Sequence, residues 1–256
     1  MKQAIIMTSF GTSVPEARGS IDAVEKALQE TAVGYTAVRA FTSPTIRRIL
    51  AGRGEQIFSL TEALEQMRRE GMDRVAVQPT HLLYGYEYDK LRAEAERFSG
   101  CFETLATGRP LLADNNDILY FAEKLAETHP PQEGAAIVYM GHGTEHFANA
   151  VYPALQTALH LAGRDDIYIG TVEGWPGLED ILRQLKTPSR VALLPLMLVA
   201  GDHARNDMDI DWRQRLEQAG HSVTCAFTGL GELAWVQKMY QNRLSETLSS
   251  MYSNKL

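Results

Sequence analysis

One pattern of residues occurs twice in this chain, and it constrains the fold more than any other feature. Ala4–Thr12 reads AIIMTSFGT, and 132 residues later Ala136–Thr144 reads AIVYMGHGT. Further matching segments follow in the same order: Ala40–Pro44 with Val172–Pro176, Arg74–Pro79 with Arg190–Pro195, and strands that end at Thr107-Gly108 and Thr228-Gly229. Any two buried strands resemble each other, but Gly-Thr, Pro and Gly positions shared in one order favour an internal duplication. We therefore expect two similar lobes, residues 1–125 and 126–256.

Amphipathic segments separate these strand-like runs. Between residues 15 and 31, apolar side chains recur at steps of four, three and four, which places them on one helix face: Ala17, Ile21, Val24 and Leu28. Ser59 and Glu62 have the spacing of a helix capping box. Buried strands joined by helical crossovers indicate parallel sheets covered on both faces. The predicted fold class is α/β, with a parallel four-stranded sheet flanked by helices in each lobe.

Composition and charge exclude several classes of protein. The 256 residues are 45% hydrophobic and 22% charged, which is typical of a folded globular protein, and no apolar run approaches the ~18 residues of a membrane span. A net charge of −7 argues against general binding to nucleic acid or to anionic membranes, which requires clustered Lys and Arg. Two cysteines are too few for a disulfide framework or a thiolate metal site. The apolar run Ala4–Met7 is too short for a signal peptide, so we expect a cytoplasmic protein.

Three metal-binding side chains follow successive predicted strands of the second lobe, namely His142, Glu173 and His203. Ligands of open parallel sheets bind beyond the carboxyl ends of the strands. Two imidazoles and one carboxylate suit a first-row divalent metal. The alternative is that each of these residues is a hydrogen-bonded structural group. His81 and His146 are further candidates, because His81 follows a strand and His146 lies four residues after His142.

The equivalent positions of the first lobe carry different chemistry. They are Phe10, Phe41 and Glu87, so this lobe offers an apolar wall and one carboxylate. A large flat ligand between the two lobes would suit such a combination. No Walker-type phosphate loop is present in the sequence, so no nucleotide is expected.

Motifs spread over nearly the whole chain resemble one family. They are SFGT at Ser9–Thr12, MGHG at Met140–Gly143, Val172-Glu173 and, most specific of all, LPLMLVAGDHARNDM at Leu194–Met208. These motifs resemble the anaerobic-pathway sirohydrochlorin cobaltochelatases, class II tetrapyrrole chelatases related in fold to ferrochelatase. The resemblance implies that His142, Glu173 and His203 bind the metal and catalyse its insertion, and that Glu87 is an acidic residue of the facing half.

The resemblance also implies a reaction. Divalent cobalt, the substrate metal, is inserted into sirohydrochlorin or its oxidised precorrin-derived form in anaerobic cobalamin biosynthesis, without ATP. Iron and nickel stay open as alternatives, because a set of two histidines and one glutamate does not distinguish these metals. An alternative of another class is a non-catalytic carrier of tetrapyrrole or metal. A homo-oligomer also stays open.

Sirohydrochlorin carries many carboxylates, which an acidic protein must hold through local donors. The loop after the first strand offers the hydroxyls of Ser9 and Thr12 and nearby helix N-terminal amides. Together with Phe10 and Glu87, these residues form the predicted substrate-binding set. Arg53 and Arg205 are candidate charged partners of the carboxylates.

Overall fold

The computed structural model describes residues 1–186, 190–201 and 204–253, and the chain forms two compact units. The first unit comprises Met1–Leu111 together with Gly231–Leu256, and the second comprises Leu112–Leu230. None of the helices in the described ranges has the length and apolar character needed to cross a membrane.

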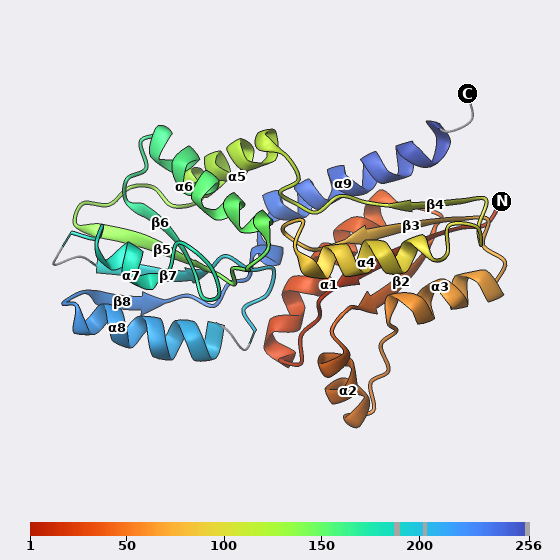
Figure 1. The fold of residues 1–256 in the computed structure, drawn as a ribbon, viewed down its shortest axis with the longest axis horizontal. Coiled ribbons are helices and arrows are strands. Elements are labelled where there is room, and N and C mark those ends of the chain that lie inside the picture. Colours follow the sequence, from red (N-terminus) through yellow and green to blue (C-terminus); the bar gives the residue numbers. More distant parts are fainter. Residues whose placement is uncertain (187–189, 202–203, 254–256) are drawn as a thin grey trace. The chain divides into compact units, whose positions relative to one another are not determined.

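The first unit is built on a sheet of four parallel strands in the order β2-β1-β3-β4 (Figure 1). The strands are β1 (Gln3–Ser9), β2 (Thr36–Phe41), β3 (Arg74–Pro79) and β4 (Thr104–Thr107). Its helices are η1 (Pro15–Ala17), α1 (Arg18–Thr31), α2 (Pro44–Gly52), α3 (Leu60–Arg69), α4 (Tyr86–Glu96) and α9 (Ala234–Ser253). The short turn η4 (Leu230–Glu232) precedes α9 and begins with the last residue of the second unit.

The second unit repeats this topology, with four parallel strands in the order β6-β5-β7-β8. The strands are β5 (Ala135–Gly141), β6 (Ile167–Thr171), β7 (Arg190–Pro195) and β8 (Ser222–Cys225). Its helices are α5 (Asn115–Thr128), η2 (Phe147–Ala150), α6 (Val151–Leu161), α7 (Leu178–Leu182), η3 (Ala204–Trp212) and α8 (Arg213–Gln218). The predicted α/β class with two parallel four-stranded sheets is confirmed, and the equal strand order agrees with an internal duplication.

Alternating strand residues point to two different helix layers in the first unit. Ala4, Ile6, Val75 and Val77 pack in one cluster with apolar side chains of α3 and α4. Helix α1 covers the opposite face of the sheet, and its predicted stripe is buried, with Ile21, Val24 and Leu28 at most 1% exposed. The predicted capping box begins α3, where Ser59 accepts from the Glu62 amide and the Glu62 carboxylate accepts from the Ser59 amide.

The second unit has the same two-layer arrangement around its sheet. Val138 and Met140 of β5 share one apolar cluster with Ile181 of α7, Trp212 of η3 and Leu216 of α8. Helices α5 and α6 pack together outside this cluster. The sheet is therefore covered on both faces, and its strand ends remain as the place where loops can carry functional side chains.

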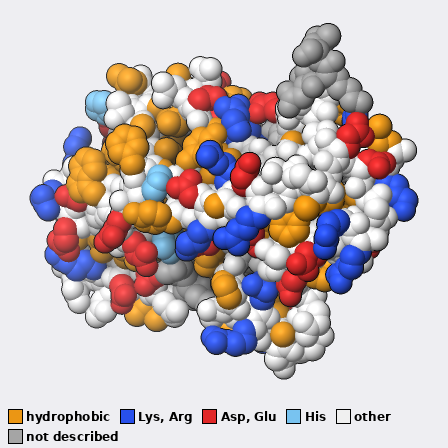
Figure 2. Space-filling model, turned by 45° about the vertical axis from the view of Figure 1, so that its right-hand side comes forward, with side chains coloured by type: hydrophobic (Ala, Val, Ile, Leu, Met, Phe, Trp, Pro, Cys, Tyr) orange, Lys and Arg blue, Asp and Glu red, His pale blue; other side chains and the backbone are white. Residues whose placement is uncertain are grey.

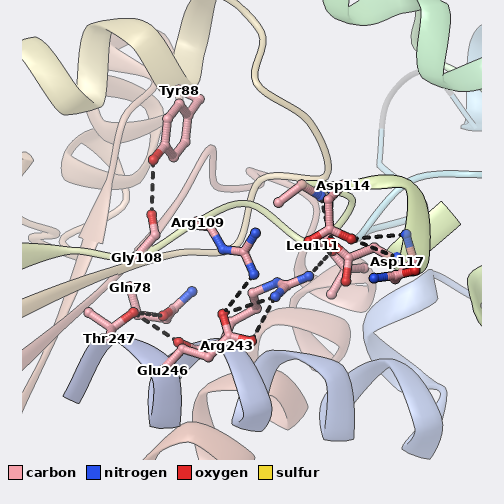
Figure 3. A network of polar contacts seen from close by, with 12 residues as sticks. Gln78, Tyr88, Gly108, Arg109, Leu111, Asp114, Asp117, Arg243, Glu246 and Thr247 are labelled. Atoms are coloured by element: carbon pink, nitrogen blue, oxygen red, sulfur yellow. Dashed lines mark hydrogen bonds and ion pairs between the residues drawn. The ribbon is translucent and has the colours of Figure 1, made fainter. Parts of the chain in front are cut away.

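The last helix, α9, packs on the sheet of the first unit. The Tyr240 hydroxyl donates to the carbonyl of Thr80 at 2.7 Å. Figure 3 shows a second contact, in which Thr247 Oγ1 donates to Gln78 Oε1 at 3.3 Å. Arg243 reaches the carbonyl of Leu111 at 3.3 Å and lies beside Glu246. These polar contacts, together with the packing of α9 on α1, β3 and β4, fix the helix in the first unit.

The boundaries of the units differ from the expected lobes of residues 1–125 and 126–256 on two points. Helix α5 packs on α6 and lies wholly in the second unit, so residue 125 falls inside this helix rather than at a boundary. Helix α9 returns to the first unit. Its periodicity indicates a buried face, but a sheet of either unit could cover that face, and only the tertiary fold selects one.

Candidate metal centre

His142 and Glu173 lie on neighbouring loops at the carboxyl ends of β5 and β6. The hydrogen-bond ladder of the two strands continues past their ends, since Val172 donates to the carbonyl of Gly141 at 3.1 Å and Glu173 donates to that of His142 at 2.8 Å. This places the two side chains next to each other, with His142 Nδ1 3.7 Å from Glu173 Oε2. The side chains are 43% and 58% exposed, so both are accessible to a metal ion.

A backbone contact favours one tautomer of His142. Its Nδ1 lies 2.9 Å from the carbonyl oxygen of Gly143, and because a carbonyl oxygen only accepts, this contact is a hydrogen bond in the tautomer whose Nδ1 carries the proton. The lone pair of the neutral ring is then on Nε2. Metal-binding histidines commonly donate their other N–H to a carbonyl or carboxylate in this way.

Two glycines allow the loops to approach this closely. Gly143 has a φ of +80°, and a Cβ there would lie 2.6 Å from the amide nitrogen of Gly174. A Cβ on Gly174 would lie 2.3 Å from Oδ1 of Asn149. A side chain at either position would separate the loops that carry His142 and Glu173.

The third predicted ligand, His203, lies outside the described residues. Within the described ranges, no group of three His, Cys, Asp or Glu side chains is arranged to hold a metal ion. His146 has a structural contact, because its Nδ1 accepts from the amide of Ala148 at 3.0 Å and caps η2. The structure thus brings together two of the three predicted ligands, His142 and Glu173.

The predicted substrate-binding residues of the first unit divide into two buried and two accessible side chains. Ser9 is fully buried and its Oγ contacts Thr80 Oγ1 at 2.8 Å, while Thr12 is 4% exposed and its Oγ1 accepts from the amide of Val14. These two hydroxyls hold the loop after β1. Phe10 is 51% exposed, and Glu87, in the first turn of α4, contacts Lys90 Nζ at 2.7 Å.

The same loop is held by one of the candidate arginines. Arg53, at the end of α2, donates from Nη1 to the carbonyl of Ser13 at 2.6 Å while its side chain stays on the surface. The contact keeps a guanidinium group beside the loop that follows β1. The side chain of Arg205 is not described.

His81 has a chemical environment that sequence reasoning did not find. Both ring nitrogens are buried and have no hydrogen-bond partner among the described residues. The backbone around the ring is fixed, since Thr80 donates to the carbonyl of Thr8 at 2.9 Å and Leu111 donates to that of His81 at 3.0 Å. Burial lowers the pKa of His81 to about 4, and the charge of Glu87 opposes this shift only in part.

Comparison with known proteins identifies relatives over nearly the full length. The family model described as "Cobalt chelatase (CbiK)" matches residues 3–249. Sirohydrochlorin cobaltochelatase of Salmonella typhimurium is 35% identical over 258 residues, which cover 97% of each chain. Sirohydrochlorin cobaltochelatase CbiKC of Nitratidesulfovibrio vulgaris is 32% identical over 98% of this chain and 92% of the relative.

Two solved structures share the fold at lower sequence identity. SirB from Bacillus subtilis with Fe3+ has a TM-score of 0.70 at 16% identity and covers 99% of this chain and 98% of its own. CbiX, titled the terminal enzyme for biosynthesis of siroheme in denitrifying bacteria, has a TM-score of 0.55 at 18% identity and covers 95% of this chain and 98% of its own. The family match over residues 3–249 and the two relatives at 35% and 32% identity show that the chain belongs to the cobalt chelatase (CbiK) family.

Proposed function

We propose that this chain is a sirohydrochlorin cobaltochelatase that inserts divalent cobalt into sirohydrochlorin without ATP. The observation that carries the proposal is the pairing of His142 and Glu173 at 3.7 Å on adjacent strand ends, in a chain of this family. A cytoplasmic location stays a prediction of the sequence, and a homo-oligomer stays open.

Metal insertion removes two pyrrole N–H protons from the macrocycle while the ion leaves its previous ligands. A neutral imidazole is both a metal ligand and a proton acceptor near neutral pH, and Nε2 of His142 has the lone pair for either role. We assign His142 as the main base and a metal ligand, Glu173 as a ligand or proton relay, and His203 as the second imidazole ligand. An incomplete ligand set with open positions favours transfer of the ion to the macrocycle over permanent retention.

The substrate is a polycarboxylate, and the chain has a net charge of −7. Figure 2 shows Lys and Arg side chains interspersed with Asp and Glu over the face that it displays. In the first unit, Arg53 is the candidate partner of a substrate carboxylate, because its guanidinium lies at the loop after β1. Phe10, half exposed on the same loop, offers apolar surface to the macrocycle, and Glu87 is a further substrate contact.

The test is anaerobic absorption spectroscopy of the purified chain with sirohydrochlorin and Co2+, Fe2+ or Ni2+ in turn, with the uncatalysed rate subtracted. We expect many turnovers with cobalt, and loss of turnover in His142→Ala and Glu173→Gln. His160→Ala, which changes an exposed histidine beside Asp165, serves as the control. Faster insertion of iron or nickel would reassign the metal, and stoichiometric binding without metallated product would indicate a carrier. Near-normal turnover in both site variants would remove the metal-centre assignment.

A further inference from the structure

The side chain of Asn149 joins the two loops that carry His142 and Glu173. Its Oδ1 accepts from the amide of Thr144 at 3.1 Å, and its Nδ2 donates to the carbonyl of Trp175 at 2.6 Å. Thr144 lies two residues after His142, and Trp175 lies two residues after Glu173. One amide group therefore connects both loops, two residues past each candidate ligand.

The contact requires the chemistry of an amide. The oxygen meets an N–H donor, and the nitrogen meets a carbonyl acceptor, so a carboxylate of the same shape could satisfy only the first. The space is also matched to the side chain, because Oδ1 occupies the place that a Cβ on Gly174 would need. Asn149 itself is held by its own amide, which donates to the carbonyl of His146 at 2.9 Å.

Without this side chain, the described loops are joined by fewer contacts. The bond from the Glu173 amide to the carbonyl of His142 fixes the backbones at the strand ends. The next residue in each loop, Gly143 or Gly174, has no Cβ, so its backbone rotates more freely than that of other residues. Asn149 limits this rotation, because it binds the loops immediately beyond the two glycines.

We propose that Asn149 is a positioning residue that sets the separation of His142 and Glu173, and through it the affinity of the site for a divalent metal. The inference rests on the proposed role of His142 and Glu173 as metal ligands. Groups that orient metal ligands without touching the ion typically change metal affinity by ~10–100-fold when they are removed.

The first test compares Asn149→Asp and Asn149→Ala with the parent chain by titration calorimetry with Co2+, alongside thermal unfolding and the KM for cobalt in insertion. We expect Co2+ to bind at least about tenfold more weakly to each folded variant, and the KM for cobalt to rise. Asn116→Ala is the matched control, since this exposed asparagine in the first turn of α5 lies in the same unit. Wild-type Co2+ affinity in Asn149→Asp and Asn149→Ala would overturn the proposal, even if both variants unfold at lower temperature.

The second test uses Gly174→Ala, whose added Cβ collides with Asn149 Oδ1. This variant should also weaken Co2+ binding, and it should do so far less in the Asn149→Ala background, where the colliding oxygen is absent. Equal effects of Gly174→Ala in both backgrounds would contradict a role for Asn149. His142→Ala distinguishes failure of this inference from failure of the proposed metal centre. If His142→Ala loses Co2+ binding while the Asn149 variants bind Co2+ normally, only the role of Asn149 is wrong. If His142→Ala binds Co2+ normally, the metal centre itself is wrong.

Discussion

Acid should weaken this fold through His81. Both ring nitrogens are buried with no hydrogen-bond partner among the described residues, so the folded protein takes up a proton there with a pKa of about 4, against 6.5 in an ordinary histidine. Between these two values the unfolded chain binds a proton that the folded chain does not. The free energy of unfolding therefore falls as the pH falls from 6.5 towards 4.

The magnitude follows from the two pKa values. The contribution of His81 is negligible at pH 7.5, reaches about 2 kcal/mol of lost stability at pH 5, and is complete at about 3 kcal/mol below pH 4. Carboxylates whose pKa is lowered by ion pairs or hydrogen bonds, such as Glu55, Glu62 and Asp166, also reduce stability in acid. Their contribution is common to the parent and to a His81 variant, so it cancels in the difference between them.

The assay is urea unfolding of the parent and of His81→Phe at intervals from pH 5 to pH 7.5. We expect the parent to lose about 2 kcal/mol more than the variant over this range, because phenylalanine fills the site without a titrating group. His160→Asn is the control and should follow the parent, since His160 lies exposed beside Asp165. Parallel curves for the parent and His81→Phe would refute the reasoning, as would an NMR titration in which the folded His81 ring protonates near pH 6.5.

Two further variants test packing, one at the candidate metal centre and one where α9 contacts Thr80 in the first unit. Gly143→Ala should cost about 2 kcal/mol or more in urea unfolding, because its φ is +80° and its Cβ would lie 2.6 Å from the Gly174 nitrogen. Gly134→Ala, with a φ of +65° but no atom within 4 Å of the added Cβ, should cost only about 1 kcal/mol. Equal losses of unfolding free energy in the two glycine variants would show that the contact between Gly143 and Gly174 does not add to the cost. Tyr240→Phe should lower the free energy of unfolding by about 1–2 kcal/mol, because the buried carbonyl of Thr80 loses its 2.7 Å donor. Tyr120→Phe, at a partly exposed tyrosine, should have no measurable effect, and the same result for Tyr240 would show that α9 does not depend on this bond.

The positions of the two described candidate ligands could be predicted from the sequence, although their role in binding metal stays a proposal. His142 and Glu173 each follow a recognisable buried strand, and parallel pairing brings the carboxyl ends of neighbouring strands to one edge of a sheet. In the first unit, the position of a residue at a strand end did not predict whether its side chain is accessible. The pattern that places Ser9 and Thr12 at a strand end does not reveal that the Ser9 hydroxyl is bonded to Thr80 after β3 or that the Thr12 hydroxyl is bonded to the Val14 amide.

The sequence by itself determined the α/β class, the repeated four-strand pattern and the strand-end residues, because these follow from local periodicity and from the duplication. Only the tertiary structure decided that α9 packs on the first sheet, that the ring nitrogens of His81 are buried without a partner among the described residues, and that Asn149 connects two loops. Each of these depends on contacts between residues far apart in the chain or on different loops. Periodicity predicts which face of a helix is buried and where a strand ends. It does not predict which surface covers that face or which side chain contacts the loop after that strand.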